Sequence, residues 1–154
     1  MTAQQPVLTV TLNPALDLSS AADEVRPDLK LRCDKPVVEP GGGGINVSRA
    51  IKILGGQSTA MVALGGTTGT RIAEMLKSDG LSVVRLTAPG ETRQSLAVND
   101  RATGGQYRFV LPGPEWHRAH VADMTSAIAE SARAGGWVVV SGSNPPGVPD
   151  GFEQ

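Results

Sequence analysis

The residues of this chain best suited to chemistry are four consecutive glycines at positions 41–44, followed closely by Asn46. Glycine adopts backbone conformations that other residues avoid, and it lets a ligand approach the main chain. The segment after the glycines reads as the start of a helix, where the first N–H groups lack partners within the helix and carry the positive end of its dipole. The pattern therefore predicts a pocket for a polar ligand, to which Asn46 adds a side-chain amide.

The simplest alternative is a flexible glycine-rich loop that only precedes a helix, and a glycine run alone favours that interpretation. A linker is normally flanked by polar, low-complexity sequence. Here the run lies between two valines at 37–38 and an amphipathic series of apolar residues at 45, 47, 51 and 54. These flanks indicate that the glycines lie inside a folded unit.

Further polar residues stand beside the expected strand ends and turns. Each alone is most simply a solvated surface residue. Together, however, a carboxylate and an amide suit the hydroxyls of a sugar, and the cations suit a phosphate. Residues 141–147 follow an apolar stretch, which places their hydroxyl and N–H groups at the edge of the expected sheet. The set comprises Asp17, Lys30, Arg32, Asn46, Arg93 and Ser143.

Other patterns carry less weight. No Gly-x-x-x-x-Gly-Lys-Ser/Thr sequence occurs, which argues against a P-loop. Residues 65–69 match a dinucleotide fingerprint poorly, and a simple tight turn accounts for them better. His117 and His120 have a spacing that could serve a metal, but no nearby cluster completes a site, so exposed histidines at a helix start are expected. Cys33 is expected to be a small packing residue.

Composition narrows the class of protein. The 154 residues are 40% hydrophobic, enough for one domain with its own core, and the 14 basic and 15 acidic residues are spread without runs. Nothing indicates a nucleic-acid or membrane surface. A single cysteine permits no internal disulfide, and no secretion signal or span of about 20 apolar residues is visible, so a cytoplasmic protein is expected.

The elements that must position these residues follow from periodicity. Apolar, strand-like stretches alternate with helical ones, which predicts an α/β fold with a parallel sheet. Expected strands cover 7–12, 58–64, 81–86 and 137–140, and expected helices begin near Asn46 and cover 69–78 and 121–133.

Two stretches break this alternation. Residues 15–38 have no helical period, and 94–100 with 106–111 resembles a hairpin around a turn at 103–105. We interpret segments 15–38 and 93–111 as a small β-sheet lid over the carboxyl edge of the main sheet, where folds of this type bind ligands.

With these elements in place, the chain resembles the amino-terminal half of a PfkB-type sugar kinase of the ribokinase-like family. Residues 11–17 (TLNPALD) are similar to an opening motif of its phosphofructokinase and tagatose-phosphate kinase branch. Residues 41–65 are similar to the first family signature, and residues 141–147 (SGSNPPG) to a further family segment. Stretches at 30–33, 39–40 and 106–110 resemble the minor, ATP-dependent 6-phosphofructokinases more than the fructose-1-phosphate kinases.

The resemblance implies a role for each site residue. It assigns Asp17, Gly42, Gly43 and Asn46 to sugar hydroxyls, and Lys30, Arg93 and Ser143 to the phosphate that the sugar already carries. It also implies a homodimer formed through the lid, whose exposed strands would otherwise be free to pair with other chains. The implied reaction is transfer of phosphate from ATP, with Mg²⁺, to a sugar phosphate, for which fructose 6-phosphate is expected.

Length is the main departure from the family, whose members are about twice as long. The Gly-Ala-Gly-Asp segment that supplies the family's catalytic aspartate, and nearly all of the nucleotide site, are expected beyond Gln154. Residues 1–154 are therefore expected to be the amino-terminal part of a kinase domain, inactive or nearly so alone, with no catalytic residue and no metal ligand. The alternatives are a 1-phosphofructokinase or tagatose-6-phosphate kinase, a non-catalytic sugar-phosphate-binding or dimerisation module, and an unrelated nucleotide-binding domain.

Overall fold

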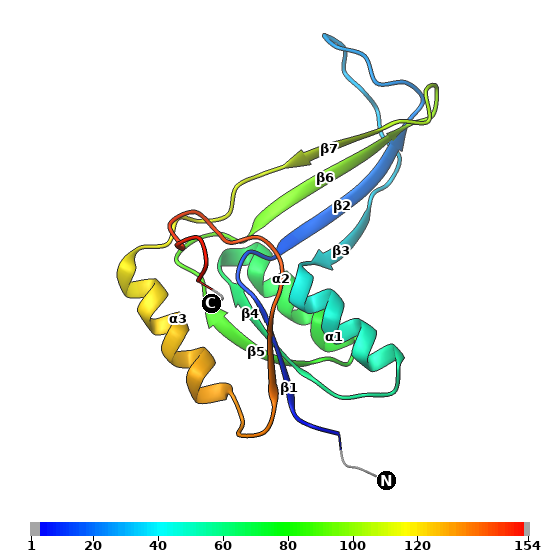
Figure 1. Ribbon diagram of the computed structural model, residues 1–154. Coiled ribbons are helices and arrows are strands. Elements are labelled where there is room, and N and C mark those ends of the chain that lie inside the picture. The colour runs from blue at the N-terminus through cyan, green and yellow to red at the C-terminus, as the bar shows by residue number, and fades with distance from the viewer. Residues whose placement is uncertain (1–3, 153–154) are drawn as a thin grey trace.

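Alternating strands and helices build a four-stranded parallel sheet in the computed structural model, which describes residues 4–152. The strand order is β5-β4-β1-β8, and each neighbouring pair is parallel. Helices flank this sheet (Figure 1). The strands are β1 (Val7–Thr11), β4 (Thr59–Leu64), β5 (Ser82–Thr87) and β8 (Trp137–Val140), and the helices are α1 (Gly43–Ile53), α2 (Gly66–Ser78) and α3 (Arg118–Ser131).

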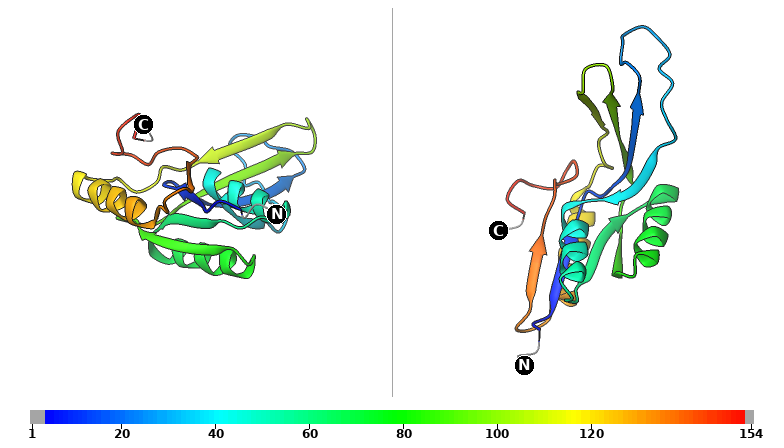
Figure 2. Two further views of the ribbon diagram at one scale, coloured as in Figure 1. Left: turned by 60° about the horizontal axis from the view of Figure 1, so that its bottom comes forward. Right: turned by 90° about the vertical axis from the view of Figure 1, so that its right-hand side faces the viewer.

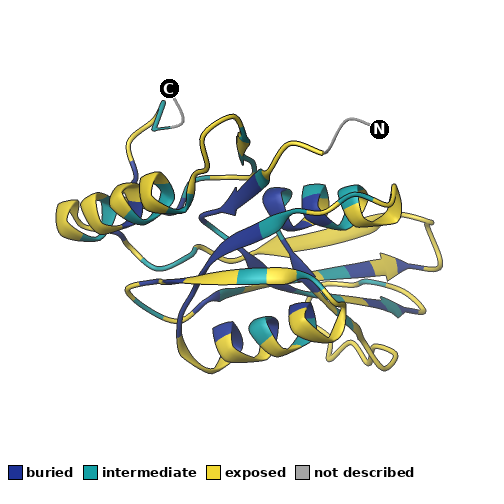
Figure 3. Ribbon diagram, turned by 90° about the horizontal axis from the view of Figure 1, so that it is seen from below, coloured by how far each residue is buried: buried dark blue, intermediate teal, exposed yellow. Residues whose placement is uncertain are grey.

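Apolar side chains cover both faces of the parallel sheet. In β4, Ala60, Val62 and Leu64 join one cluster with residues of α1 and α2, whereas Met61 and Ala63 join another that includes Met124 of α3. A strand buried on both faces reads as an uninterrupted apolar run, which is why residues 59–64 lack a polar alternation. Most of α3 remains exposed (Figure 3).

The second sheet, which we call the lid, projects from the carboxyl edge of the parallel sheet (Figures 1 and 2). Its strand order is β3-β2-β6-β7, in which β2 and β6 are parallel and the outer pairs are antiparallel. The loop from residue 23 to 36 extends at its far end (Figure 1). The lid strands are β2 (Ala15–Ala22), β3 (Val37–Gly41), β6 (Arg93–Asp100) and β7 (Gln106–Val110).

The two faces of the lid differ in character. Side chains alternate along a strand, and residues in register share a face. Leu18, Leu96 and Phe109 are in register and form an apolar row, in which Leu96 and Phe109 are 38% and 54% exposed. Glu39, Asp17 and Ser95 are in register on the opposite face, which we call the polar face and which also carries Arg108 and, on the edge strand, Val110.

The fold class predicted from the sequence is confirmed: an α/β, ribokinase-like parallel sheet flanked by helices, with a small additional β-sheet. The strand at 137–140 and the hairpin of β6 and β7 lie where they were expected. Helices α2 and α3 each begin three residues earlier than predicted, at Gly66 and Arg118. The expectation that Cys33 packs inside is wrong, because it is exposed in the loop between β2 and β3.

No helix in residues 4–152 is long and apolar enough to cross a membrane.

Candidate functional site

The glycine run lies at the carboxyl edge of the parallel sheet, against the ends of β1 and β8. Ser141, the residue after β8, donates its main-chain N–H to the carbonyl of Val10 and accepts the N–H of Gly44, both at 3.1 Å. Thr11, the last residue of β1, accepts the N–H of Ile45 at its Oγ1, at 3.0 Å. The start of α1 is therefore fixed directly against two strand ends.

No position of this run has room for a side chain, as Gly42 and Gly43 illustrate. Gly42 has a φ of 147°, and a Cβ there would lie 2.5 Å from the methyl group of Thr11. A Cβ on Gly43 would lie 2.5 Å from the Ser141 hydroxyl oxygen and 2.6 Å from the main-chain nitrogen of Gly142. Separations this short are not tolerated, so both positions require glycine for the main chain to pack against the ends of β1 and β8.

Asn46 and Asp17 both stand next to the glycine run: Asn46 follows it in α1, and the Asp17 carboxyl lies against Gly41. Asn46 is exposed in the first turn of α1, and Asp17 is half-buried on the polar face of the lid. Burial raises the pKa of the Asp17 carboxyl, and the charges of Arg93 and Arg108 and a hydrogen bond from Ser95 oppose that rise. A carboxylate and an amide thus stand next to the glycine run, and both groups are suited to sugar hydroxyls.

A cationic corner lies where the lid joins the parallel sheet. The Arg93 guanidinium donates from Nε and Nη2 to the carbonyl of Asn13, at 3.2 and 3.1 Å, and from Nη1 to the carbonyl of Leu111 at 3.4 Å. The Asn13 amide donates to the Ser143 hydroxyl oxygen at 3.1 Å and to the Asn144 carbonyl at 3.4 Å. Arg93 and Ser143, which are 50 positions apart in the sequence, are thereby attached to one residue.

This corner opens into a cleft of about 520 Å³. Arg93 contributes the cationic side chain of its lining, Ser143 a hydroxyl and Asp150 a carboxylate, while Leu111 and prolines provide apolar walls. A fixed guanidinium beside a hydroxyl is a common way to bind a phosphate oxygen.

Lys30 lies apart from the other six predicted site residues. It is exposed in the loop from residue 23 to 36 at the far end of the lid (Figure 1). Arg101 forms ion pairs with Asp23 and Asp34, and these hold both ends of the loop to the hairpin of β6 and β7. Within one chain, Lys30 does not join Arg93 and Ser143.

Three residues at the site were not singled out from the sequence. Thr11 orients the start of α1, Asn13 connects Arg93 to Ser143, and Arg108 acts on the charge of Asp17. The hairpin register carried a usable signal for Arg108, because its partner Ala97 lies on the same face as Asp17. Asn13 lies inside the TLNPALD motif, but nothing in that stretch indicated its contacts, which span 80 and 130 positions.

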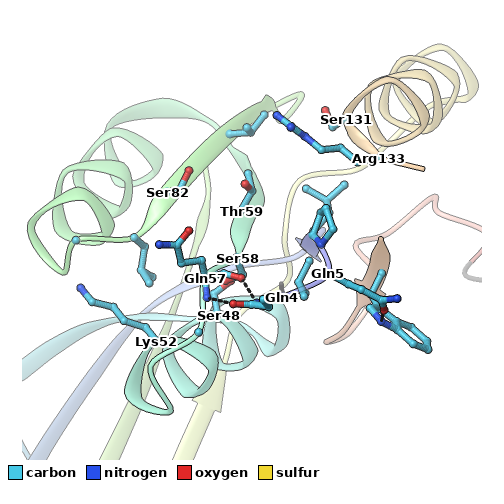
Figure 4. A pocket seen from close by; sticks show the side chains of 18 of the residues that line it. Gln4, Gln5, Ser48, Lys52, Gln57, Ser58, Thr59, Ser82, Ser131 and Arg133 are labelled. Carbon is cyan, nitrogen blue, oxygen red and sulfur yellow. Dashed lines mark hydrogen bonds between the residues drawn. The ribbon is translucent and has the colours of Figure 1, made fainter. Parts of the chain in front are cut away.

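A cavity of about 1020 Å³ is lined by residues at the starts of β1, β4 and β5, at the opposite edge of the sheet, and Figure 4 shows its side chains. The amide of Gln4 there pairs with the main chain of Gln57, donating at 2.6 Å and accepting at 2.8 Å. Its lining includes none of the seven predicted site residues. Parallel α/β sheets bind ligands at the carboxyl edge, and we therefore place the candidate site at the glycine run rather than in the larger cavity.

The second glycine-rich turn, at residues 65–69, already holds a carboxylate of its own chain. Glu91 accepts the N–H of Thr67 at 3.2 Å and of Thr68 at 2.6 Å, at the first turn of α2. These bonds, chiefly from the main chain of Thr68, lower the pKa of Glu91. The Glu91 carboxylate therefore occupies the amino-terminal end of α2, where a dinucleotide phosphate would have to bind. This favours the interpretation of residues 65–69 as a simple tight turn.

The two histidines serve the start of α3. The main-chain N–H of His117 donates to Nδ1 of His120 at 3.1 Å, and both side chains take part in the cap of the helix. Within residues 4–152 there is no group of three or more His, Cys, Asp or Glu side chains placed to hold a metal ion.

Comparison with known proteins agrees with this architecture. Residues 10–152 match the pfkB family of carbohydrate kinases. The chain is 43% identical to the ATP-dependent 6-phosphofructokinase isozyme 2 of Mycobacterium tuberculosis over 96% of its own length and 44% of that protein's. It is 31% identical to the 1-phosphofructokinase of Xanthomonas campestris, over 93% and 45%.

Solved structures give the same result. The phosphofructokinase-2 of Escherichia coli in complex with fructose-6-phosphate superposes with a TM-score of 0.87 at 42% identity, covering 95% of this chain and 48% of that one. The same enzyme is also known in a tetrameric inhibited form. The chain thus spans about half the length of the relatives it matches. On the match over residues 10–152, the chain belongs to the pfkB family of carbohydrate kinases.

Proposed function

We propose that the full-length protein is a 6-phosphofructokinase, which transfers a phosphoryl group from ATP to fructose 6-phosphate and forms fructose 1,6-bisphosphate. The observation that carries this proposal is the convergence of the glycine run, Asp17, Asn46 and the Arg93–Ser143 corner at one edge of the sheet. The higher identity to a 6-phosphofructokinase than to a 1-phosphofructokinase supports the choice of sugar phosphate.

In this proposal the chain supplies the sugar-phosphate end of the site. Asp17 and Asn46 bond sugar hydroxyls, which lie against the main chain of Gly42 and Gly43. Arg93 and Ser143 hold the phosphate that the sugar already carries, so that the opposite end of the sugar is presented for reaction. Binding of this kind fixes orientation, and fixed orientation is a large part of phosphoryl-transfer catalysis.

ATP is the proposed phosphoryl donor, with Mg²⁺ neutralising charge on the transferred group. The described residues carry no acidic cluster suited to a metal ion, and the glycine turn of α2 is occupied by Glu91. These residues therefore do not fit either group, and we assign no step of the transfer to them. The cytoplasmic location expected from the sequence stays a prediction.

The lid is the proposed interface of a homodimer. Its apolar face exposes Leu96, Tyr107 and Phe109, which are 38%, 43% and 54% accessible to solvent, and pairing with a second copy would cover them. Because Lys30 lies at the far end of its own lid, its predicted contact with a phosphate would require the second copy. The mass of the full-length protein in solution tests the pairing.

Replacement of Asn46 tests the sugar site. We expect Asn46→Ala to weaken binding of fructose 6-phosphate about three- to tenfold, the effect of one lost hydrogen bond, with little change in melting temperature because the side chain is exposed. Isothermal titration of the full-length protein with fructose 6-phosphate, fructose 1-phosphate and tagatose 6-phosphate measures affinity and ranks the sugars.

The matched control is Thr67→Ala, an exposed position in the first turn of α2 whose main chain, not its side chain, contacts Glu91. The control should bind fructose 6-phosphate like the wild type. Equal affinity of wild type and Asn46→Ala would count against the sugar site. Binding of fructose 6-phosphate without ATP turnover would favour a non-catalytic binding module.

A further inference from the structure

Asn13 joins three segments that are far apart in the sequence. Its side-chain Nδ2 donates to the Ser143 hydroxyl oxygen and to the Asn144 carbonyl, while its own carbonyl accepts two N–H groups of Arg93. It therefore contacts both residues of the proposed phosphate corner and lines the same cleft.

The orientation of this amide is set by its partners. The Asn144 carbonyl can only accept a hydrogen bond, so the NH₂ group of Asn13 must face it. The Asn13 Oδ1 is then buried without a partner, and Gly113 packs so closely that any Cβ there would collide with it. An unpaired buried oxygen lowers stability, so stability alone does not account for an asparagine here.

The fixed amide has a consequence for Ser143. A hydroxyl has one donor and two acceptor sites. Because Ser143 Oγ accepts the hydrogen bond from Asn13, its O–H is left to donate elsewhere, and the cleft is beside it. A hydroxyl that is directed to donate suits an anion, which can only accept.

The same residue restrains the guanidinium. Arg93 uses three of its five N–H donors on the carbonyls of Asn13 and Leu111, which leaves two for a ligand. A planar guanidinium that is already held in place loses less freedom when it binds a phosphate.

We propose that Asn13 is a positioning residue that presets Arg93 and Ser143 as paired donors for the phosphate of the substrate. Its main-chain carbonyl, which a change of side chain leaves in place, holds the guanidinium, and its side-chain amide directs the serine hydroxyl into the cleft. This inference rests on the proposed function, since it assigns a cause to the geometry of the same site.

The test compares fructose 6-phosphate with fructose, which lacks the phosphate, as probes of the full-length protein. We expect Asn13→Ala to weaken the binding of fructose 6-phosphate roughly tenfold and the binding of fructose less than twofold. In a double-mutant cycle, Asn13→Ala added to Ser143→Ala should cost less than a further twofold, because the amide acts through that hydroxyl. Asn13→Asp should weaken fructose 6-phosphate binding more than Asn13→Ala does. The carboxylate would accept a hydrogen bond from the Ser143 O–H, which could then no longer donate to the ligand, and it would repel the phosphate.

The outcomes separate the two proposals. Equal loss for both sugars, or additive losses in the cycle, would overturn the role of Asn13 while leaving the phosphate corner intact. If the wild type itself bound both sugars equally, the phosphate corner would be wrong, and this inference with it.

Gly113→Ala perturbs Asn13 from a neighbouring position. It therefore tests the same inference if the Asn13 variants fail to fold. A methyl group there pushes on Oδ1 of Asn13 without removing any donor. We expect the same selective loss of affinity for fructose 6-phosphate relative to fructose, in a variant that still unfolds in a cooperative thermal transition. An unchanged ratio of the two affinities in a folded Gly113→Ala protein would contradict the proposal.

Discussion

Helices α1 and α2 begin alike in sequence and differ in what meets their first turns. Each starts at glycines just after a strand, and neither has an acidic residue in its first turn. In α2, Glu91 accepts two of the leading N–H groups. In α1, the corresponding partners are neutral oxygens of Ser141 and Thr11.

The comparison shows that a glycine-rich helix start is not a ligand site by itself. Whether such a start can bind a ligand depends on the charges near it and on the atoms that surround the glycines. At α2 the chain supplies its own anion, which satisfies the dipole. At α1 no carboxylate of the chain accepts the first N–H groups in the described residues, and the polar face of the lid stands beside them.

The largest expected effect comes from adding one methyl group to each helix start. At Gly43 the new Cβ would meet main-chain atoms of Ser141 and Gly142, which cannot move aside without shifting the strand end. We expect Gly43→Ala to lose about 1–3 kcal/mol of unfolding free energy and about 100-fold in fructose 6-phosphate affinity. Chemical denaturation and titration measure the two effects.

At Gly66 the obstacle is the flexible side chain of Glu91, which can swing into solvent. Gly66 also has a φ of 64°, which disfavours alanine. We expect Gly66→Ala to destabilise the protein and to leave fructose 6-phosphate affinity within about twofold of wild type. If Gly43→Ala and Gly66→Ala lost equal affinity for fructose 6-phosphate, the start of α1 would be no more a part of the sugar site than the start of α2.

A smaller effect is expected at Asp17, where binding and stability should change in opposite directions. Burial raises the pKa of its carboxyl, against the opposing charges of Arg93 and Arg108. The folded protein therefore holds this proton more tightly than the unfolded chain, and ionisation lowers stability as pH rises from the usual aspartate pKa through the raised one.

Asp17→Asn removes that ionisation. The variant should have a higher melting temperature than wild type at pH 7, should lose the advantage at a pH below the usual aspartate pKa, and should bind fructose 6-phosphate more weakly. Calorimetry across this pH range checks the first two outcomes. A lower melting temperature at pH 7 would show that the nearby charges of Arg93 and Arg108 and the Ser95 hydrogen bond outweigh the effect of burial.

The smallest effect is expected at Glu91, which is exposed. Hydrogen bonds from Thr68, first from its main chain, lower the pKa of this carboxyl. Its contribution is present above the unfolded-state pKa and is lost as pH falls through the lowered one. Glu91→Gln should reduce the melting temperature slightly at pH 7 and should not reduce it below that window, with sugar affinity unchanged throughout.

The parallel sheet and the lid hairpin could be predicted from the sequence because short stretches of neighbouring residues indicate them. The apolar run at β4 and the hairpin turn of β6 and β7 need only neighbouring residues to be recognised. The start of α2 was placed three residues late because the carboxylate that satisfies its N–H groups comes from Glu91, 23 and 24 positions away.

The site was predictable to the extent that it follows strand ends. Asp17, Arg93 and Ser143 each stand beside such an end and come to the same edge of the sheet. Lys30 does not, because a long loop carries it to the far end of the lid. Asn13 was noted only as part of the TLNPALD motif, because its role depends on contacts that only the folded chain creates.

One side chain of the lid offers a practical handle. Cys33 is the only cysteine of the chain, and it is exposed in the far loop of the lid. Among residues 1–154 a maleimide dye would attach only there, and its emission would respond to whatever approaches the end of the lid. Fructose 6-phosphate and dilution of the protein could then be distinguished as separate causes of a fluorescence change in one labelled sample.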